Sequence, residues 1–186
     1  MPETLWRNLK SMWLQRRREV DVKYKRSLPL ADYVVDRWEK ARELGFGEGS
    51  SIYDSVLVLG DVQVGANTWI GPFVVLDGSG GLTIGSHCSI SAGVQIYSHD
   101  TVEWAVTGGQ STATNAPTSI GDNCYIGPNT VIAKGVRIGG GSIIGANSLV
   151  LSDIEAGSKA FGTPCRVVGE ARATPVTASA SCSQTA

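Results

Sequence analysis

The chain contains two histidines, His87 and His99, and imidazole is the side chain that ordinarily titrates closest to neutral pH. His99 follows Tyr97 and Ser98 at the start of an irregular stretch, residues 97–119, whereas His87 lies inside a regular repeat. Long irregular segments between regular elements are disproportionately functional. We therefore expect His99 to act as a general base, which removes a proton from a nucleophile, and His87 to be a solvated surface residue.

A general base works best when its second ring nitrogen is held by a hydrogen-bond acceptor. Asp100 and Glu103 follow His99 closely and are the two candidate orienting acids, while a backbone carbonyl is the alternative partner. Trp104 in the same stretch and Tyr97 at its start are expected to contact the substrate. Such loop-borne side chains need a rigid scaffold that holds them against a second wall of the site.

The scaffold is indicated by an aliphatic residue at every sixth position on both sides of the irregular stretch. These positions are Ile52, Val58, Val64, Ile70, Leu76, Ile84, Ile90, Ile96, Ile120, Ile126, Ile132, Ile138, Ile144 and Val150. Small or β-branched residues follow four positions later, at Thr68, Val74, Cys88, Val94, Cys124, Thr130, Val136, Ser142 and Ser148. The pattern predicts a β-solenoid in which three hexapeptides make one triangular coil, both sets point inward, and glycines suit the tight corners.

Counting eighteen residues per coil predicts where the irregular parts of the chain meet. A two-residue insertion within residues 77–83 and the irregular stretch 97–119 leave the same corner of the prism, one coil apart. Asp77 is then expected beneath Tyr97, with Ala133 above it. We expect Asp77 to share the substrate-binding wall with Tyr97 at this corner, because a concave site forms there more readily than on a flat face.

Three runs of sequence carry a family resemblance: IGPFVVLDGSGGLTIGSHCSISAGVQIYSHD, SIGDNCYIGPNTVIAKGVRIGGGSIIGANSLVLSDI and GTPCRVVG. Over roughly residues 50–169 the chain resembles the hexapeptide-repeat acyltransferases, most closely the galactoside, maltose and polysaccharide O-acetyltransferases. The resemblance implies an all-β solenoid, a left-handed parallel β-helix, with acetyl coenzyme A as acyl donor and His99 as base. It also implies a homotrimer with active sites between subunits. The family often has proline where this chain has Asp100, so the loop geometry differs locally.

In the resembling enzymes the pantetheine arm of coenzyme A lies in a groove between two prisms, and cations near the last coils meet its phosphates. The matching positions here are Tyr125, Gly127, Ala133, Ala146, Ser148, Leu151, Lys159 and Arg166. Where the family frequently has Thr-Lys after the last coil, this chain has Leu151 and Ser152, so one expected cation is missing.

The resemblance implies an acetyltransferase that acts on the hydroxyl of a sugar or polysaccharide precursor. Acetylation of the amine of a nucleotide-linked amino sugar is the alternative, and a non-catalytic trimeric scaffold is a third hypothesis. A γ-type carbonic anhydrase shares the prism but needs three histidine ligands for its metal, and this chain has two histidines. We therefore expect no metal site.

The composition limits which classes of partner and which compartment are expected for this protein. The formal net charge of −1 gives no reason to expect nucleic acid as a partner. The four cysteines are widely spaced and are expected to be free thiols in a reducing compartment. The N-terminus lacks the pattern of a secretory signal, which predicts a cytoplasmic protein.

Three segments are expected: a helical segment at 1–48, the acyltransferase β-helix at 49–169, and a disordered tail at 170–186. Residues 3–18 have the spacing of an amphipathic helix, and residues 1–26 carry eight basic and three acidic side chains, net +5. Two roles are open for this helix. It packs against the prism or a neighbouring subunit, or it makes a peripheral contact with the inner face of a membrane that carries anionic lipid.

Overall fold

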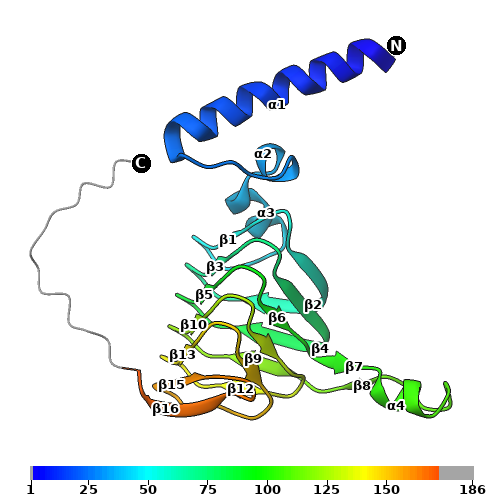
Figure 1. Cartoon of the computed structure of the whole chain (residues 1–186), viewed down its shortest axis with the longest axis vertical. Coiled ribbons are helices and arrows are strands. Elements are labelled where there is room, and N and C mark those ends of the chain that lie inside the picture. Colours follow the sequence, from blue (N-terminus) through cyan, green and yellow to red (C-terminus); the bar gives the residue numbers. More distant parts are fainter. Residues whose placement is uncertain (1, 172–186) are drawn as a thin grey trace, which may run out of the picture.

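A computed structural model describes residues 2–171, which form a triangular β-solenoid with helices at its N-terminal end (Figure 1). The helices are α1 (Pro2–Tyr24), α2 (Ala31–Val34), α3 (Arg37–Glu43) and α4 (Val102–Val106). The tail expected at 170–186 lies outside the described residues from residue 172 onward.

Most strands are two-residue segments, as expected for the flat faces of a hexapeptide coil. Before the irregular stretch the strands are β1 (Ser51–Ile52), β2 (Leu57–Val64), β3 (Trp69–Ile70), β4 (Val75–Ile84), β5 (Ser89–Ile90) and β6 (Gln95–Ile96). Within and after it they are β7 (His99–Asp100), β8 (Thr114–Asn115), β9 (Thr118–Ile120), β10 (Tyr125–Ile126), β11 (Val131–Ile132), β12 (Arg137–Ile138), β13 (Ile143–Ile144), β14 (Leu149–Val150), β15 (Ser158–Phe161) and β16 (Arg166–Glu170).

The coils stack through parallel pairing of strands one turn apart. One face has the order β1-β3-β5-β10-β13-β15, with β16 added antiparallel at the end. The other two faces belong to one sheet, with the order β12-β9-β4-β6-β11-β14, and β2 pairs with β4. The two faces join because β2 and β4 continue around a corner, where their register shifts between Gly60 and Val62. This shift accommodates the insertion predicted within residues 77–83.

The interior of the solenoid is filled as the hexapeptide period predicts. Thirteen of the fourteen aliphatic positions are buried, and the exception, Val58 near the first coil, is partly buried against the same core. All nine residues at the fourth following position are buried as well. The core is therefore a continuous column of aliphatic side chains along the prism, closed at the N-terminal end by Phe46 and Ala41.

The glycines that follow the aliphatic residues have a different structural reason from the one expected. The left-handed corner conformation falls two residues later, at positions such as Asn129 with a φ of 57° and Gly93 with a φ of 70°. Gly127, by contrast, has no positive φ, but a Cβ atom there would lie 2.5 Å from the backbone nitrogen of Ala146 in the next coil. Glycine is required at this position because the coils approach closely, rather than because the backbone turns.

The helical segment is only partly attached to the solenoid. α3 packs on β1 and α1 packs on α2, and α1 projects away from the coils in Figure 1. Leu5 and Trp6 of α1 are 70% and 65% exposed. The apolar side chains at the start of α1 are therefore exposed in the single chain, and the roles expected for this helix stay predictions. Among the described residues, no helix combines the length and apolar character needed to cross a membrane.

The cysteines that the structure describes, Cys88, Cys124 and Cys165, are buried free thiols, as expected; Cys182 lies outside the described residues.

Candidate active site

The ring of His99 contacts the carboxylate of Asp77, which belongs to the coil below. His99 Nδ1 lies 2.6 Å from Asp77 Oδ2, and the Asp77 side chain is completely buried whereas 31% of the His99 side chain is exposed. The pairing of Leu76 with Ile96 sets the register, so Asp77 lies beneath Tyr97 as the coil count predicted. His99 begins β7, where the chain leaves the upper coil, and the corner thus brings the two side chains together.

Asp77 is held in its ionised form by the groups that surround it. Its Oδ1 atom accepts hydrogen bonds from the Ser79 hydroxyl at 2.6 Å and the Ser79 N–H at 3.1 Å, and Oδ2 accepts one from the Ser98 N–H at 2.9 Å. Burial raises the pKa of Asp77, but the bonds from Ser79, Ser98 and the His99 ring outweigh burial and hold that pKa well below its usual range. The carboxylate is therefore charged at neutral pH.

The charge on Asp77 decides which nitrogen of His99 carries the proton. An ionised carboxylate only accepts hydrogen bonds, so the 2.6 Å contact requires a proton on Nδ1. In the neutral ring Nε2 is then unprotonated and has a free lone pair. Within the described residues Nε2 makes no hydrogen bond, and the partly exposed ring leaves it free to accept a proton from a substrate.

The orienting partner of His99 is not either of the two acids that the sequence suggested. Asp100 follows His99 on β7, and successive side chains of a strand point in opposite directions. Its carboxylate instead lies 2.9 Å from Lys134 Nζ and accepts a hydrogen bond from Thr114. Glu103 lies on α4, exposed, and its carboxylate makes no ion pair among the described residues. Neither acid contacts His99, so the expected pairing is replaced by Asp77.

Lys134 fastens the hairpin that carries His99, a role that the sequence did not reveal. β7 pairs antiparallel with β8, with His99 opposite Asn115 and Asp100 opposite Thr114. The Lys134 ammonium group contacts both Asp100 and the Thr114 hydroxyl, so it ties the two strands to the coil above. The sequence did contain one indication of this role. Lys134 follows Ala133, which the coil count places directly above Tyr97, where the irregular stretch begins.

The two aromatic residues expected to bind substrate lie in different places. Tyr97 belongs to the corner, and its hydroxyl donates a hydrogen bond to Gln95 Oε1 at 2.7 Å. Trp104 is 54% exposed on α4, at the tip of the hairpin, which extends away from the prism in Figure 1. Only Tyr97 therefore lies in the same corner as Asp77; Trp104 lies out on the hairpin, where it can contact a substrate or a second copy.

Two of the residues expected to contact coenzyme A, Ala133 and Leu151, lie along the same corner as Tyr97, toward the last coils. The Tyr97 N–H donates to Ile132 O and the Ala133 N–H donates to Val150 O, each at 3.0 Å. Ala133 therefore stacks above Tyr97, and Leu151, 58% exposed, stacks above Ala133. This column of small and apolar groups runs from the level of His99 toward the C-terminal end.

Three other expected contacts lie along a different edge of the same prism. Tyr125 belongs to β10, while Gly127 and Ala146 follow β10 and β13 at the next corner. The face formed by β6, β11 and β14 separates them from His99 within one chain. One copy of the chain thus presents His99 and these three positions on two different corners.

Ser148 is a correction to the expected coenzyme A surface. It is buried, its hydroxyl donates to Gly145 O at 2.7 Å, and its own Oγ atom accepts from the Gly162 N–H at 3.2 Å. Its position four residues after Ile144 points it into the prism, so its side chain serves the fold rather than a ligand.

Lys159 and Arg166 are exposed near the C-terminal end of the solenoid, on the antiparallel strands β15 and β16. Arg166 Nη1 donates to the carbonyl oxygen of Cys165 at 2.8 Å. Neither cation forms an ion pair with a carboxylate within residues 2–171, which leaves both charges available to an anionic ligand.

Comparison with known proteins finds similarity to acetyltransferases and to a family of hexapeptide repeats. Residues 117–152 match the family "Bacterial transferase hexapeptide (six repeats)". The chain is 50% identical over 54 residues to the galactoside O-acetyltransferase of Escherichia coli (strain K12), covering 29% of this chain and 27% of that protein. It is 45% identical over 53 residues to the 2,3,4,5-tetrahydropyridine-2,6-dicarboxylate N-acetyltransferase of Staphylococcus aureus (strain Newman), covering 28% and 22%. The chain thus spans about a quarter of the length of these curated relatives.

Among solved structures, the fold is similar over nearly its whole length to a hexapeptide-repeat containing acetyltransferase from Vibrio cholerae O1 biovar eltor, complexed with acetyl coenzyme A. The TM-score is 0.66 at 27% identity, over 90% of this chain and 89% of that chain. The expected fold class, a left-handed parallel β-helix with N-terminal helices and a protruding loop, is confirmed. In its repeats, its matched segments and its fold, this chain is thus similar to hexapeptide-repeat acetyltransferases.

Proposed function

We propose that this chain transfers an acetyl group from acetyl coenzyme A to a sugar hydroxyl, with His99 as general base and Asp77 as its orienting partner. The observation that carries the proposal is the 2.6 Å contact between His99 Nδ1 and a buried, ionised Asp77. That contact leaves Nε2 as a proton acceptor at the open side of the corner, which is the arrangement that general-base catalysis requires.

In this mechanism the acceptor hydroxyl gives its proton to Nε2 while its oxygen forms a bond to the thioester carbonyl carbon. The ring then carries a positive charge, which the Asp77 carboxylate stabilises across the hydrogen bond. The tetrahedral intermediate collapses, the carbon–sulfur bond breaks, and the departing thiolate of coenzyme A receives the proton from Nε2. No covalent intermediate on the enzyme is needed.

The choice of a hydroxyl acceptor rests on the relatives rather than on the site. The galactoside enzyme is an O-acetyltransferase, and the Staphylococcus aureus relative is an N-acetyltransferase. A His–Asp pair can deprotonate either type of nucleophile. An amine acceptor, such as that of an amino sugar, is therefore the second candidate, and Tyr97 is the residue at the corner best placed to contact either acceptor.

We also propose that the complete site forms between copies of the chain in a homotrimer. His99, Ala133 and Leu151 lie along one corner, whereas Tyr125, Gly127 and Ala146 lie along another. A coenzyme A groove that uses both sets needs the second corner from a neighbouring subunit. Sedimentation velocity of the full chain should then give the mass of three chains.

A substrate screen tests the proposed reaction. Release of free thiol from acetyl coenzyme A is followed with single sugars, nucleotide sugars and their amino analogues as acceptors, with His99→Ala run in parallel. We expect thiol release that depends on one class of acceptor and on His99. If every acceptor leaves the rate at the level of the His99→Ala variant, the proposed activity is wrong.

A further inference from the structure

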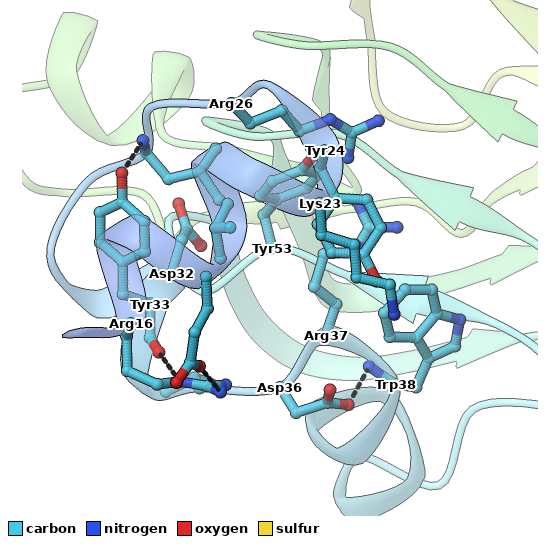
Figure 2. Close-up of a pocket in the computed structure, with 14 residues that line it drawn as sticks. Arg16, Lys23, Tyr24, Arg26, Asp32, Tyr33, Asp36, Arg37, Trp38 and Tyr53 are labelled. Carbon is cyan, nitrogen blue, oxygen red and sulfur yellow. Dashed lines mark hydrogen bonds and ion pairs between the residues drawn. The ribbon is translucent and has the colours of Figure 1, made fainter. Parts of the chain in front are cut away.

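A cavity lies far from His99, between the N-terminal helices and the first coil. Its volume is about 260 Å³, and it is lined by residues of α1, α2, α3, the 25–30 connection and Tyr53 (Figure 2). It opens at the capped end of the solenoid, whereas β7 and β8 project near the other end of the molecule (Figure 1). The acyl-transfer proposal assigns no role to this cavity.

The cavity lining carries four cationic and three acidic side chains, and three of the cations lie against aromatic rings. The guanidinium carbon of Arg37 lies 4.6 Å from the ring centre of Trp38 and 4.7 Å from that of Tyr53. Lys23 Nζ lies 5.0 Å from the ring centre of Tyr24, and Figure 2 shows Lys23, Tyr24 and Arg37 on the same side of the cavity. Stacking fixes the position of a cation without neutralising its charge.

Acidic groups do not neutralise these cations. Glu19 pairs with Arg16 at 2.9 Å, and Asp36 accepts hydrogen bonds from the backbone N–H groups at the start of α3. Within residues 2–171 no carboxylate pairs with Lys23 or Arg37. An anionic ligand would therefore find unpaired, pre-positioned donors in this cavity.

Two buried polar atoms of the cavity lining have no partner. Asp32 is 8% exposed; its Oδ1 atom accepts from the Asp54 N–H at 2.7 Å, but Oδ2 makes no hydrogen bond. Nε of Arg37 is also buried without an acceptor. Buried polar groups in folded proteins are nearly always satisfied, so each of these atoms is expected to gain a partner, either an ordered water or a group of a ligand. Arg37 requires an acceptor, and Asp32 requires a donor.

We propose that this cavity binds a phosphate ester that carries a neighbouring hydroxyl group. The phosphate oxygens accept from Arg37 and pair with Lys23, and the hydroxyl donates to Asp32 Oδ2. Planar guanidinium groups match phosphate geometry, and the carboxylate selects a ligand that has a donor beside its charge. A soluble sugar phosphate and a phospholipid headgroup both have this chemistry. The site is independent of the acetyltransferase reaction.

The test measures ligand binding by the full chain rather than activity. Calorimetric titrations use inorganic phosphate and glucose 1-phosphate, and co-sedimentation uses phosphatidylcholine vesicles with and without phosphatidylglycerol. Arg37→Ala is compared with Arg42→Ala, a matched change on the exposed surface of α3 that does not line the cavity. Arg37→Lys keeps a cation between the rings and controls for folding. Asp32→Asn keeps an oxygen that can accept from the Asp54 N–H.

We expect Arg37→Ala to weaken binding of glucose 1-phosphate or of phosphatidylglycerol vesicles by about ten-fold or more, and Arg42→Ala to change it less than about two-fold. Whichever of the two probes depends on Arg37 identifies the source of the ligand. Asp32→Asn should weaken binding of glucose 1-phosphate but not of inorganic phosphate. Absence of binding to every probe, or equal losses in the Arg37→Ala and Arg42→Ala variants, would overturn the proposal. Equal effects of Asp32→Asn on the two soluble probes would overturn the assignment of the hydroxyl.

Discussion

Replacement of Asp77 by asparagine separates the charge of the carboxylate from its shape. Asparagine can place its amide oxygen where Oδ2 accepts from the His99 ring and the Ser98 N–H, at 2.6 and 2.9 Å in the native chain. Its NH₂ group then faces Ser79, whose hydroxyl can rotate to accept a hydrogen bond, while the Ser79 N–H loses its acceptor. The variant should therefore keep its fold and the tautomer of His99, and lose the negative charge together with the bond from the Ser79 N–H.

The cost to catalysis follows from the charge on the imidazolium formed during the reaction. A hydrogen bond to a charged partner contributes about 1.5–3 kcal/mol, against about 1 kcal/mol for a neutral one. Because each 1.4 kcal/mol corresponds to a factor of ten, the loss of about 0.5–2 kcal/mol lowers kcat by about 2- to 30-fold. The KM for acetyl coenzyme A should stay close to that of the native chain, since Asp77 is completely buried.

The assay is thiol release from acetyl coenzyme A at saturating acceptor, with thermal unfolding as a check on the fold. Glu103→Gln is the matched control, because Glu103 is an exposed acid on α4 without a contact to His99. Its kcat should stay within about two-fold of the native value, as for most surface substitutions. A native rate in Asp77→Asn, or an equal loss in Glu103→Gln, would refute the assignment of Asp77 as the partner of His99.

Three further predictions concern stability and the hairpin. Gly127→Ala places a Cβ atom 2.5 Å from the backbone of the next coil and should reduce the free energy of unfolding by about 1–3 kcal/mol in thermal or denaturant melts. Gly169→Ala is the control: its added Cβ atom has no neighbour within 4 Å, so the free energy of unfolding should hardly change. Lys134→Met removes the contacts to both strands of the hairpin and should speed limited proteolysis within residues 101–113 while lowering kcat; unchanged cleavage would show that the hairpin does not need this anchor. Hydrogen bonds hold the pKa of Asp77 below its usual range, so its charged form stabilises the fold above about pH 4, and that contribution is lost as the pH falls further. The difference in the free energy of unfolding between the native chain and Asp77→Asn should therefore be largest at neutral pH and shrink below about pH 4. A difference that does not depend on pH would contradict this.

The solenoid could be predicted from the sequence because each hexapeptide contains the residues that determine its own orientation. An aliphatic residue and its fourth follower fix the inward direction of every strand, and the buried positions of the structure repeat that pattern with Val58 as the one partly exposed case. The coil count also placed Asp77 beneath Tyr97, because the insertion and the loop leave the same corner. These features depend on local sequence and on a regular repeat.

The partner of His99 could not be predicted in the same way, because the contact joins residues 22 positions apart through the stacking of coils. Sequence proximity favoured Asp100 and Glu103, but strand alternation turns Asp100 toward Lys134, and the helix at the hairpin tip carries Glu103 to the surface. For Ser148 the two kinds of sequence evidence disagreed. The repeat predicted a side chain inside the prism, whereas the family resemblance predicted a contact with coenzyme A. Where the two disagreed, the repeat was the better guide.

The most direct test of the proposed reaction is the rate of acetyl transfer by His99→Ala, with coenzyme A binding measured on the same preparation. His87→Asn is the matched control, because His87 lies at a coil corner with a φ of 57°, a conformation that asparagine adopts at four equivalent corners. We expect His99→Ala to bind coenzyme A as the native chain does but to lose transfer by about 10²-fold or more, while His87→Asn stays near the native rate. Undiminished transfer by His99→Ala would contradict the proposed role of His99.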